Sequence, residues 1–139
     1  MPAPIIGRPV SDQVWADLRA EFTLPTLEQV RRRLTELMDD PEPVLQQLVR
    51  IFLGDGTYCP GFQFLAGGQL HPTMTSLFRH ALELQIPHNY FTAWMITPAP
   101  ELGGVRPVDS LREMVRLRSA LEAFAADLPG IRQPTRRAV

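Results

Sequence analysis

The sequence contains no lysine, a single cysteine and no long hydrophobic run: all 14 basic residues are arginines. Because Cys59 has no second cysteine to pair with, an intramolecular disulfide is excluded, and a reducing cytoplasm is the favoured compartment. Met1 to Gly7 lacks a charged segment followed by a long apolar stretch, so we expect no signal peptide. The apolar runs are too short to span a bilayer, so we expect no membrane association.

Positive and negative charges are nearly balanced. The formal net charge is -1, and this even balance argues against a protein that coats nucleic acid. Hydrophobic residues make up 45% and charged residues 21% of the 139 residues, as in ordinary globular proteins. The chain is therefore long and apolar enough to build one folded domain, or a small domain with a helical arm.

Apolar residues recur at helical spacing through most of the chain. Ser11 before the first stripe is a helix cap, and Thr26 with Gln29 has the spacing of a capping box. Asp40 followed by Pro41 predicts another helix start, with a stripe that ends before Gly54. We expect helices over approximately residues 12–22, 27–38, 41–53, 72–84, 88–95 and 108–127.

The pattern changes between these helices, near residues 58–71. Gly67-Gly68 is a tight-turn signal, so we expect Phe62–Leu65 and Gln69–His71 to pair as a hairpin. A pair of this size is only marginally stable alone, so it must lie on helices. The sequence therefore predicts an all-α fold, a compact helical domain of five to six helices with a small β-hairpin.

The residue types that carry catalysis and metal binding form no recognisable pattern. His71, His80 and His88 are nine and eight residues apart, which places no two on one helix face as metal ligands. His80 with Glu83 predicts a surface pair, and Cys59 predicts a packing thiol, since no helix start follows to lower its pKa. An enzyme that uses these residues is the least favoured interpretation, and we expect neither catalytic residues nor a cofactor.

The densest cluster of cations is the Arg-Arg-Arg run at residues 31–33. Contact with phosphate is one interpretation, but a solvated helix face is favoured because Glu28 and Glu36 neutralise part of the charge. The two helices expected between residues 26 and 53 would allow a helix-turn-helix. Because the second of them holds only one cation, Arg50, DNA binding is weakly supported.

The segment from Ala93 to Leu111 is the most distinctive of the chain. It reads Ala-Trp-Met-Ile-Thr-Pro-Ala-Pro-Glu-Leu-Gly-Gly-Val-Arg-Pro-Val-Asp-Ser-Leu. This segment resembles the core motif of the MbcA/ParS/Xre antitoxin toxin-binding domain, in which Trp, Pro, Leu-Gly-Gly, a second Pro and Asp follow at this spacing. Upstream, the Pro-Gly-Phe-Gln-Phe run at residues 60–64 is similar to a segment that precedes this domain. The resemblance covers about residues 58–126.

The resemblance implies an antitoxin, which is not an enzyme. Such proteins typically bind a RES-domain toxin that degrades NAD, occlude its active-site cleft, and usually assemble as dimers. Matching positions then fall into a structural set and a partner-binding set. We expect the structural set to be Phe62, Phe64, Trp94, Pro98 and Pro107. We expect the partner-binding set to include Leu102, Gly103, Gly104, Arg106 and Asp109.

The motifs and the hydrophobic pattern divide the chain into three expected regions. Residues 57–128 are expected to form the antitoxin-like domain, and residues 129–139 a flexible basic tail. Arg136 and Arg137 in that tail suit a cleft that binds pyrophosphate, with a solubilising tail as the alternative. Residues 1–56 are expected to be a helical segment that completes the core, mediates dimerisation or replaces a DNA-binding domain. The rival function is a stand-alone regulatory or DNA-binding adaptor.

Overall fold

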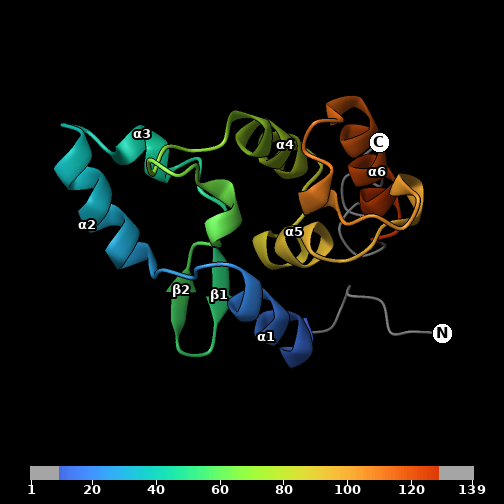
Figure 1. Cartoon of the computed structure of the whole chain (residues 1–139), viewed down its shortest axis with the longest axis horizontal. Helices are drawn as coiled ribbons and strands as arrows, with labels where there is room; N and C mark the ends of the chain where they lie inside the picture. Colours follow the sequence, from blue (N-terminus) through green and yellow to red (C-terminus); the bar gives the residue numbers. More distant parts are fainter. Residues whose placement is uncertain (1–9, 129–139) are drawn as a thin grey trace, which may run out of the picture.

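The computed structural model describes residues 10–128. Within this range the chain forms six α-helices and one two-stranded antiparallel hairpin, which confirms the helical fold class predicted from the sequence. The elements are α1 (Asp12–Glu21), α2 (Leu27–Leu37), α3 (Glu42–Leu45), β1 (Ile51–Leu53), β2 (Gly56–Tyr58), η1 (Gly61–Gln63), α4 (Pro72–Glu83), α5 (His88–Met95), η2 (Pro100–Leu102), η3 (Pro107–Asp109) and α6 (Met114–Ala126), where η marks a 3-10 turn. Figure 1 shows α2 and α3 at one end of the molecule and α6 at the other.

The main core is built from α1, α4, α5 and α6 together with β1. Leu18 of α1, Phe78 of α4, Phe91 of α5 and Leu121 of α6 are all fully buried in it. Ile51 of β1 belongs to the same cluster. The core therefore draws on residues from both halves of the chain.

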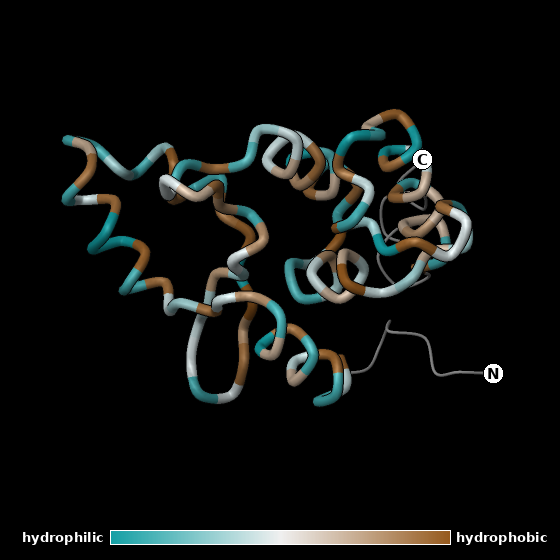
Figure 2. Tube along the Cα trace, viewed as in Figure 1, coloured by the Kyte–Doolittle hydropathy of each residue, from teal (hydrophilic) through white to brown (hydrophobic). Residues whose placement is uncertain are grey.

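A second, smaller cluster lies under α2, and we call it the satellite cluster. Val30 and Leu34 of α2 pack there against Leu45, Leu48 and Cys59. Figure 2 shows hydrophilic and hydrophobic residues alternating along α2, as expected for a helix with one buried face. The opposite face of α2 is exposed.

The predicted start of α2 is confirmed. The Thr26 hydroxyl accepts a hydrogen bond from the Gln29 backbone N–H at 3.1 Å. The Gln29 side chain accepts one from the Thr26 backbone N–H at 2.8 Å. These two bonds complete the capping box and satisfy backbone donors that the first turn of a helix leaves free.

The third predicted helix is wrong over most of its length. α3 has four residues, and residues 51–53 are strand β1. Within Gly54-Asp55-Gly56, interpreted as a helix stop, Gly54 and Asp55 form the turn of the hairpin and Gly56 begins β2. Short apolar runs fit a buried helix and a strand equally well, so periodicity alone could not separate them here. A four-residue helix also leaves residues 26–53 without a recognition helix for a major groove.

The small hairpin is present, but it lies earlier in the chain than predicted. β1 pairs with β2 so that Ile51 lies opposite Tyr58. The predicted pairing of residues 62–65 with 69–71 is reduced to a single bridge between Phe64 and Leu70. The backbone cannot continue as a strand there because the preceding residues turn into η1.

Side chains satisfy the outer edge of β1 and the residues just before it. The buried Gln63 amide accepts a hydrogen bond from the Val49 N–H at 2.8 Å and donates one to the Val49 carbonyl at 2.9 Å. Asn89 repeats this pattern on Phe52, with distances of 2.8 and 3.0 Å. Each amide thus replaces one residue of a neighbouring strand. At Val49, which is buried, this pairs backbone groups that would otherwise be unsatisfied.

His88 binds the same edge between the two amides. Its Nδ1 accepts a hydrogen bond from the Arg50 backbone N–H at 2.9 Å, and its ring packs edgewise on Phe52 and Phe78 with centroid distances of 5.7 and 4.8 Å. Burial lowers the pKa of His88, and the positive charge of Arg50 acts in the same direction. The imidazole is therefore neutral, with its proton on Nε2.

The segment after β2 pins the linker between α1 and α2. The Gly61 N–H donates to the Thr23 carbonyl at 2.8 Å, and the Cys59 N–H donates to the Pro25 carbonyl at 2.9 Å. A Cβ at Gly61 would collide with the Thr23 hydroxyl and would lie 2.8 Å from its carbonyl oxygen. Glycine is required at this position because two backbone segments approach each other closely.

Gly61→Ala should lower the free energy of unfolding by about 2 kcal/mol, because the linker must move to admit the methyl group. Gly54→Ala is the matched control, since a Cβ there meets nothing within 4 Å, and it should change stability by less than about 0.5 kcal/mol. Urea denaturation of both variants makes the comparison. Equal stability of the two variants would contradict the close approach at Gly61.

The pKa of His88 is lower in the folded chain than its ordinary value of 6.5. As the pH falls, the imidazole is therefore protonated in the unfolded chain before it is protonated in the folded chain. The resulting stability is present above pH 6.5 and is lost as the pH falls below it. His88→Asn keeps an acceptor for the Arg50 N–H but does not titrate. We expect the variant to lose less stability than the wild type between pH 7 and pH 5 in urea denaturation. The same loss in both proteins would rule out His88 as the source.

Candidate functional site

The loop that joins α5 to α6 holds the predicted partner-binding residues that lie within the described range. Residues 98–109 of this loop, here called the 98–109 loop, fold into η2 and η3 with a bridge between Ala99 and Val105. The Ala99 N–H donates to the Val105 carbonyl at 3.1 Å, and the Gly104 N–H donates to the Ala99 carbonyl at 2.9 Å. These bonds close the tip of the loop on itself.

Gly103 and Gly104 form that tip. Their φ angles are +68° and +86°, a conformation that side chains with a Cβ rarely adopt. No heavy atom lies within 4 Å of an ideal Cβ at either position. The glycines are therefore required by backbone conformation, and they leave the peptide groups of the tip open to an approaching surface.

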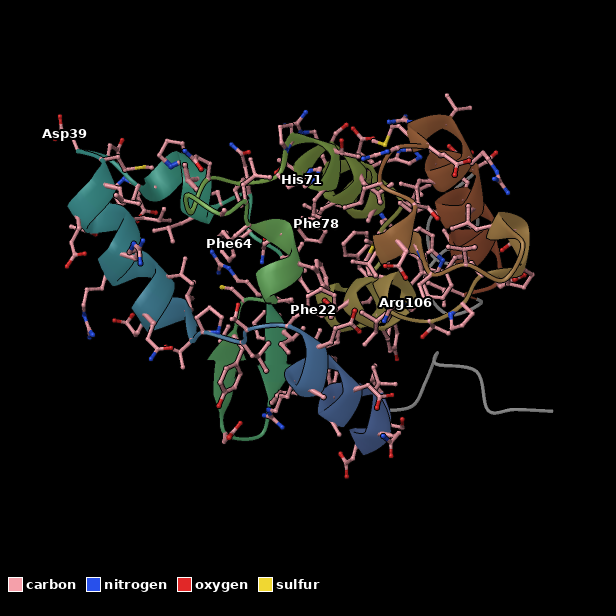
Figure 3. The ribbon with its side chains drawn as sticks, in the orientation of Figure 1. Phe22, Asp39, Phe64, His71, Phe78 and Arg106 are labelled. Atoms are coloured by element: carbon pink, nitrogen blue, oxygen red, sulfur yellow. The ribbon has the colours of Figure 1, made fainter. Side chains whose placement is uncertain are left out.

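Arg106 ties the loop to α1. Its two terminal nitrogens each donate to one carboxylate oxygen of Glu21, both at 2.7 Å, and its Nε donates to Asp109 at 2.8 Å. The hydrogen bond from Arg106 lowers the pKa of Glu21, and the same pairing raises the pKa of Arg106. Figure 3 shows Arg106 where the loop passes α5. Arg106 and Asp109, both expected to bind a partner, are thus already paired within the chain.

The other side of the loop is anchored in the main core. Leu102 is only 3% exposed and Pro107 is buried. Trp94, at the end of α5, stacks on Phe124 of α6 with ring centroids 6.0 Å apart. Leu102, which we expected to contact a partner, therefore anchors η2 instead of presenting a surface.

More than half of the loop is exposed. Val105 keeps 45% of its surface exposed, and the other exposed residues are Pro98, Pro100, Glu101, Gly103, Gly104 and Asp109. Gly103, Gly104 and Val105 are consecutive and carry no charge. The sequence interpretation did not select Val105. Its place between the glycines and Arg106, inside the resembling motif, was the available signal. The described structure therefore presents a short apolar and glycine tip as the candidate contact surface.

The upstream motif lies apart from this loop. Phe62 is buried and packs edgewise on Phe22, with centroids 5.6 Å apart, whereas Phe64 belongs to the satellite cluster. Figure 3 shows Phe64 and Arg106 in different parts of the molecule. Between the two phenylalanines, Gln63 pairs with Val49. Sequence reasoning missed this role, for which a polar residue between two aromatics was the only signal. Arg136 and Arg137 lie outside the described residues.

His80, His88 and Cys59 have packing or structural roles, whereas the Nδ1 atom of His71 is buried without a hydrogen-bond partner among the described residues. His80 lies 2.8 Å from Glu122, which links α4 to α6, and 3.4 Å from Glu83. Burial raises the pKa of Cys59 to about 11, so the thiol is unreactive at neutral pH. Among residues 10–128, no three His, Cys, Asp or Glu side chains gather to hold a metal ion. In the same range, no helix has the length and hydropathy needed to cross a membrane.

No family model, curated protein or solved structure matches this chain. The antitoxin hypothesis therefore depends on two things: the motif between Ala93 and Leu111, and the geometry of the 98–109 loop.

Arg106→Ala should loosen the 98–109 loop, because it removes two hydrogen bonds to Glu21 of α1 and two to Asp109. We expect faster hydrogen exchange at the Ala99 and Gly104 amides, measured by NMR in the full chain. Arg31→Ala is the control. Arg31 lies on α2 and pairs with Glu42 of α3 at 3.1 Å, so its replacement also removes an ion pair but does not touch the loop. Unchanged exchange in Arg106→Ala would show that the loop holds its shape without the tie to α1.

Proposed function

We propose that this protein binds and inhibits a RES-type toxin that degrades NAD, and that the 98–109 loop covers the toxin's active site. One observation carries the proposal: an exposed tip, Gly103 to Val105, is held between core anchors on one side and the Arg106 tie on the other. A surface of this kind suits docking. It also lies at the centre of the segment that resembles the antitoxin family.

A preformed loop lowers the cost of binding. Ordering a flexible segment costs roughly 1–2 kcal/mol for each residue whose backbone becomes fixed. The 98–109 loop is already ordered before binding by its internal hydrogen bonds and its prolines, so binding requires little further ordering. The bare peptide groups of the tip can approach a partner surface closely, while Val105 supplies an apolar contact.

In this proposal the chain acts by steric occlusion, not by catalysis. We further propose that it works in the cytoplasm and as a homodimer. The alternative, a stand-alone regulatory or DNA-binding adaptor, has less support because α3 is too short to serve as a recognition helix. Salt-dependent binding to promoter DNA would favour that alternative.

The basic tail is a second candidate contact within the same proposal. Arg136 and Arg137 have the chemistry to compete for a cleft that binds pyrophosphate. Deleting residues 131–139 should then weaken inhibition of the toxin. Inhibition at the wild-type level by the shortened chain would limit the contact surface to residues outside the tail.

Val105→Arg should weaken inhibition of a RES-domain toxin at least about tenfold, because a long cation would replace the exposed apolar contact at the tip. The measurement is NAD hydrolysis by a purified RES-domain toxin, titrated with the purified chain. Leu82→Arg, at an exposed apolar position on α4, is the matched control and should inhibit like the wild type. Full inhibition by a folded Val105→Arg variant would contradict the assignment of the tip.

A further inference from the structure

Two cavities of about 470 and 520 Å³ lie on the satellite cluster, beneath the turn at residues 67–68. Leu34 of α2 and Gly68 of the turn line both of them. The first also contains Leu37 and Met38, and the second contains Arg33 and Leu65. The end of α2 therefore borders two neighbouring hollows, here together called the hollow, with mostly apolar walls.

Large apolar side chains stand exposed at the rim of this hollow. Leu37 is 54% exposed and Leu65 is 42% exposed. α2 packs on the satellite cluster through Val30 and Leu34, which are buried, and through Leu27. It forms the outer edge of the molecule in Figure 1. Exposed leucines grouped around a hollow are typical of an interaction surface.

The charges around Leu37 have a particular arrangement. Arg33 lines the hollow on one side, and Asp39 follows Met38 on the other. Within the described residues neither Arg33 nor Asp39 has an ion pair, whereas Arg31 on the same helix pairs with Glu42. Figure 3 shows Asp39 projecting at the outer end of α2. Arg32 beside Arg33, and Asp40 beside Asp39, are likewise exposed and outside the ion pairs of the described residues, as is Glu36. Cations thus precede the exposed leucine by four and five residues, and anions follow it by two and three.

The spacing of Arg33, Leu37 and Asp39 is nearly symmetric. Leu37 lies four helical residues after Arg33, which is about 6 Å along the helix. α2 ends at Leu37, and Met38 is extended with φ -152° and ψ 156°. Asp39 therefore lies roughly 6 to 7 Å beyond Leu37. Along the backbone, Leu37 lies near the midpoint between the two charged residues.

We propose that this surface docks a second copy of the same chain, with the two α2 helices antiparallel across a two-fold axis at Leu37. In that arrangement Leu37 meets Leu37 of the partner subunit, and Arg33 lies opposite Asp39 of the partner subunit. The same pair forms twice, as a two-fold interface requires. This names the surface of the homodimer in the proposed function, and it does not depend on the toxin.

The charge pattern favours a second copy over other occupants. Nucleic acid or an acidic protein would pair with Arg33 but would be repelled by Asp39, which lies at about the same distance from Leu37 along the backbone. A basic partner would pair with Asp39 but would be repelled by Arg33. A partner surface that places a negative charge opposite Arg33 and a positive charge opposite Asp39 attracts both residues, and a second copy of this chain in antiparallel orientation has that arrangement.

Sedimentation equilibrium of the full chain over a range of concentrations tests the proposal. We expect the wild type to dimerise, and we expect Leu37→Glu to raise the dissociation constant at least about tenfold, because two carboxylates would meet at the axis. Val115→Glu is the control. Val115 is 84% exposed on α6, at the other end of the molecule, and its replacement should leave dimerisation unchanged.

Charge-reversal variants test whether Arg33 lies opposite Asp39 across the interface. Arg33→Asp and Asp39→Arg should each raise the dissociation constant roughly fivefold, and the double variant should restore it. A wild type that stays monomeric at all concentrations, or a dimer insensitive to Leu37→Glu, would overturn the proposal. So would a double variant weaker than either single one. Circular dichroism checks that each variant is folded. The NAD-hydrolysis titration is a separate readout, so failure of toxin inhibition is distinguishable from failure of dimerisation.

Discussion

Two amide side chains, Gln63 and Asn89, take the place of a third strand beside β1. A two-stranded hairpin leaves one edge of each strand unpaired, and backbone groups that are buried must find partners. Gln63 belongs to η1 and Asn89 to α5, so their bonds fix β1 to two elements of the helical core. This pairing helps to position β1, and the main core positions α1 through Trp15 and Leu18.

The 98–109 loop also depends on the N-terminal half of the described chain, through α1. α1 contributes Trp15 and Leu18 to the main core, and it ends at Glu21, which holds Arg106. The segment that resembles an antitoxin domain begins near residue 58. Its candidate contact surface is nevertheless held in part by a helix outside that segment. Residues 10–56 therefore help to shape the loop as well as the core.

Local rules predicted the fold class and most helix starts. The capping box at Thr26 and the prolines at the starts of α4 and α5 act within one turn of the chain, so the sequence shows them directly. Long-range contacts were not predictable in this way. Gln63 finds Val49 14 residues away and Arg106 finds Glu21 85 residues away. For the same reason Leu102 was taken for a contact residue, although the core that buries it comes from distant elements.

Native-state hydrogen exchange of the Val49, Arg50 and Phe52 amides tests most directly whether side chains pair the edge of β1. These three N–H groups donate to Gln63, His88 and Asn89. We predict that they exchange only through global unfolding, together with the amides at the centre of α5. Exchange at the rate of an open strand edge, well ahead of α5, would contradict the account.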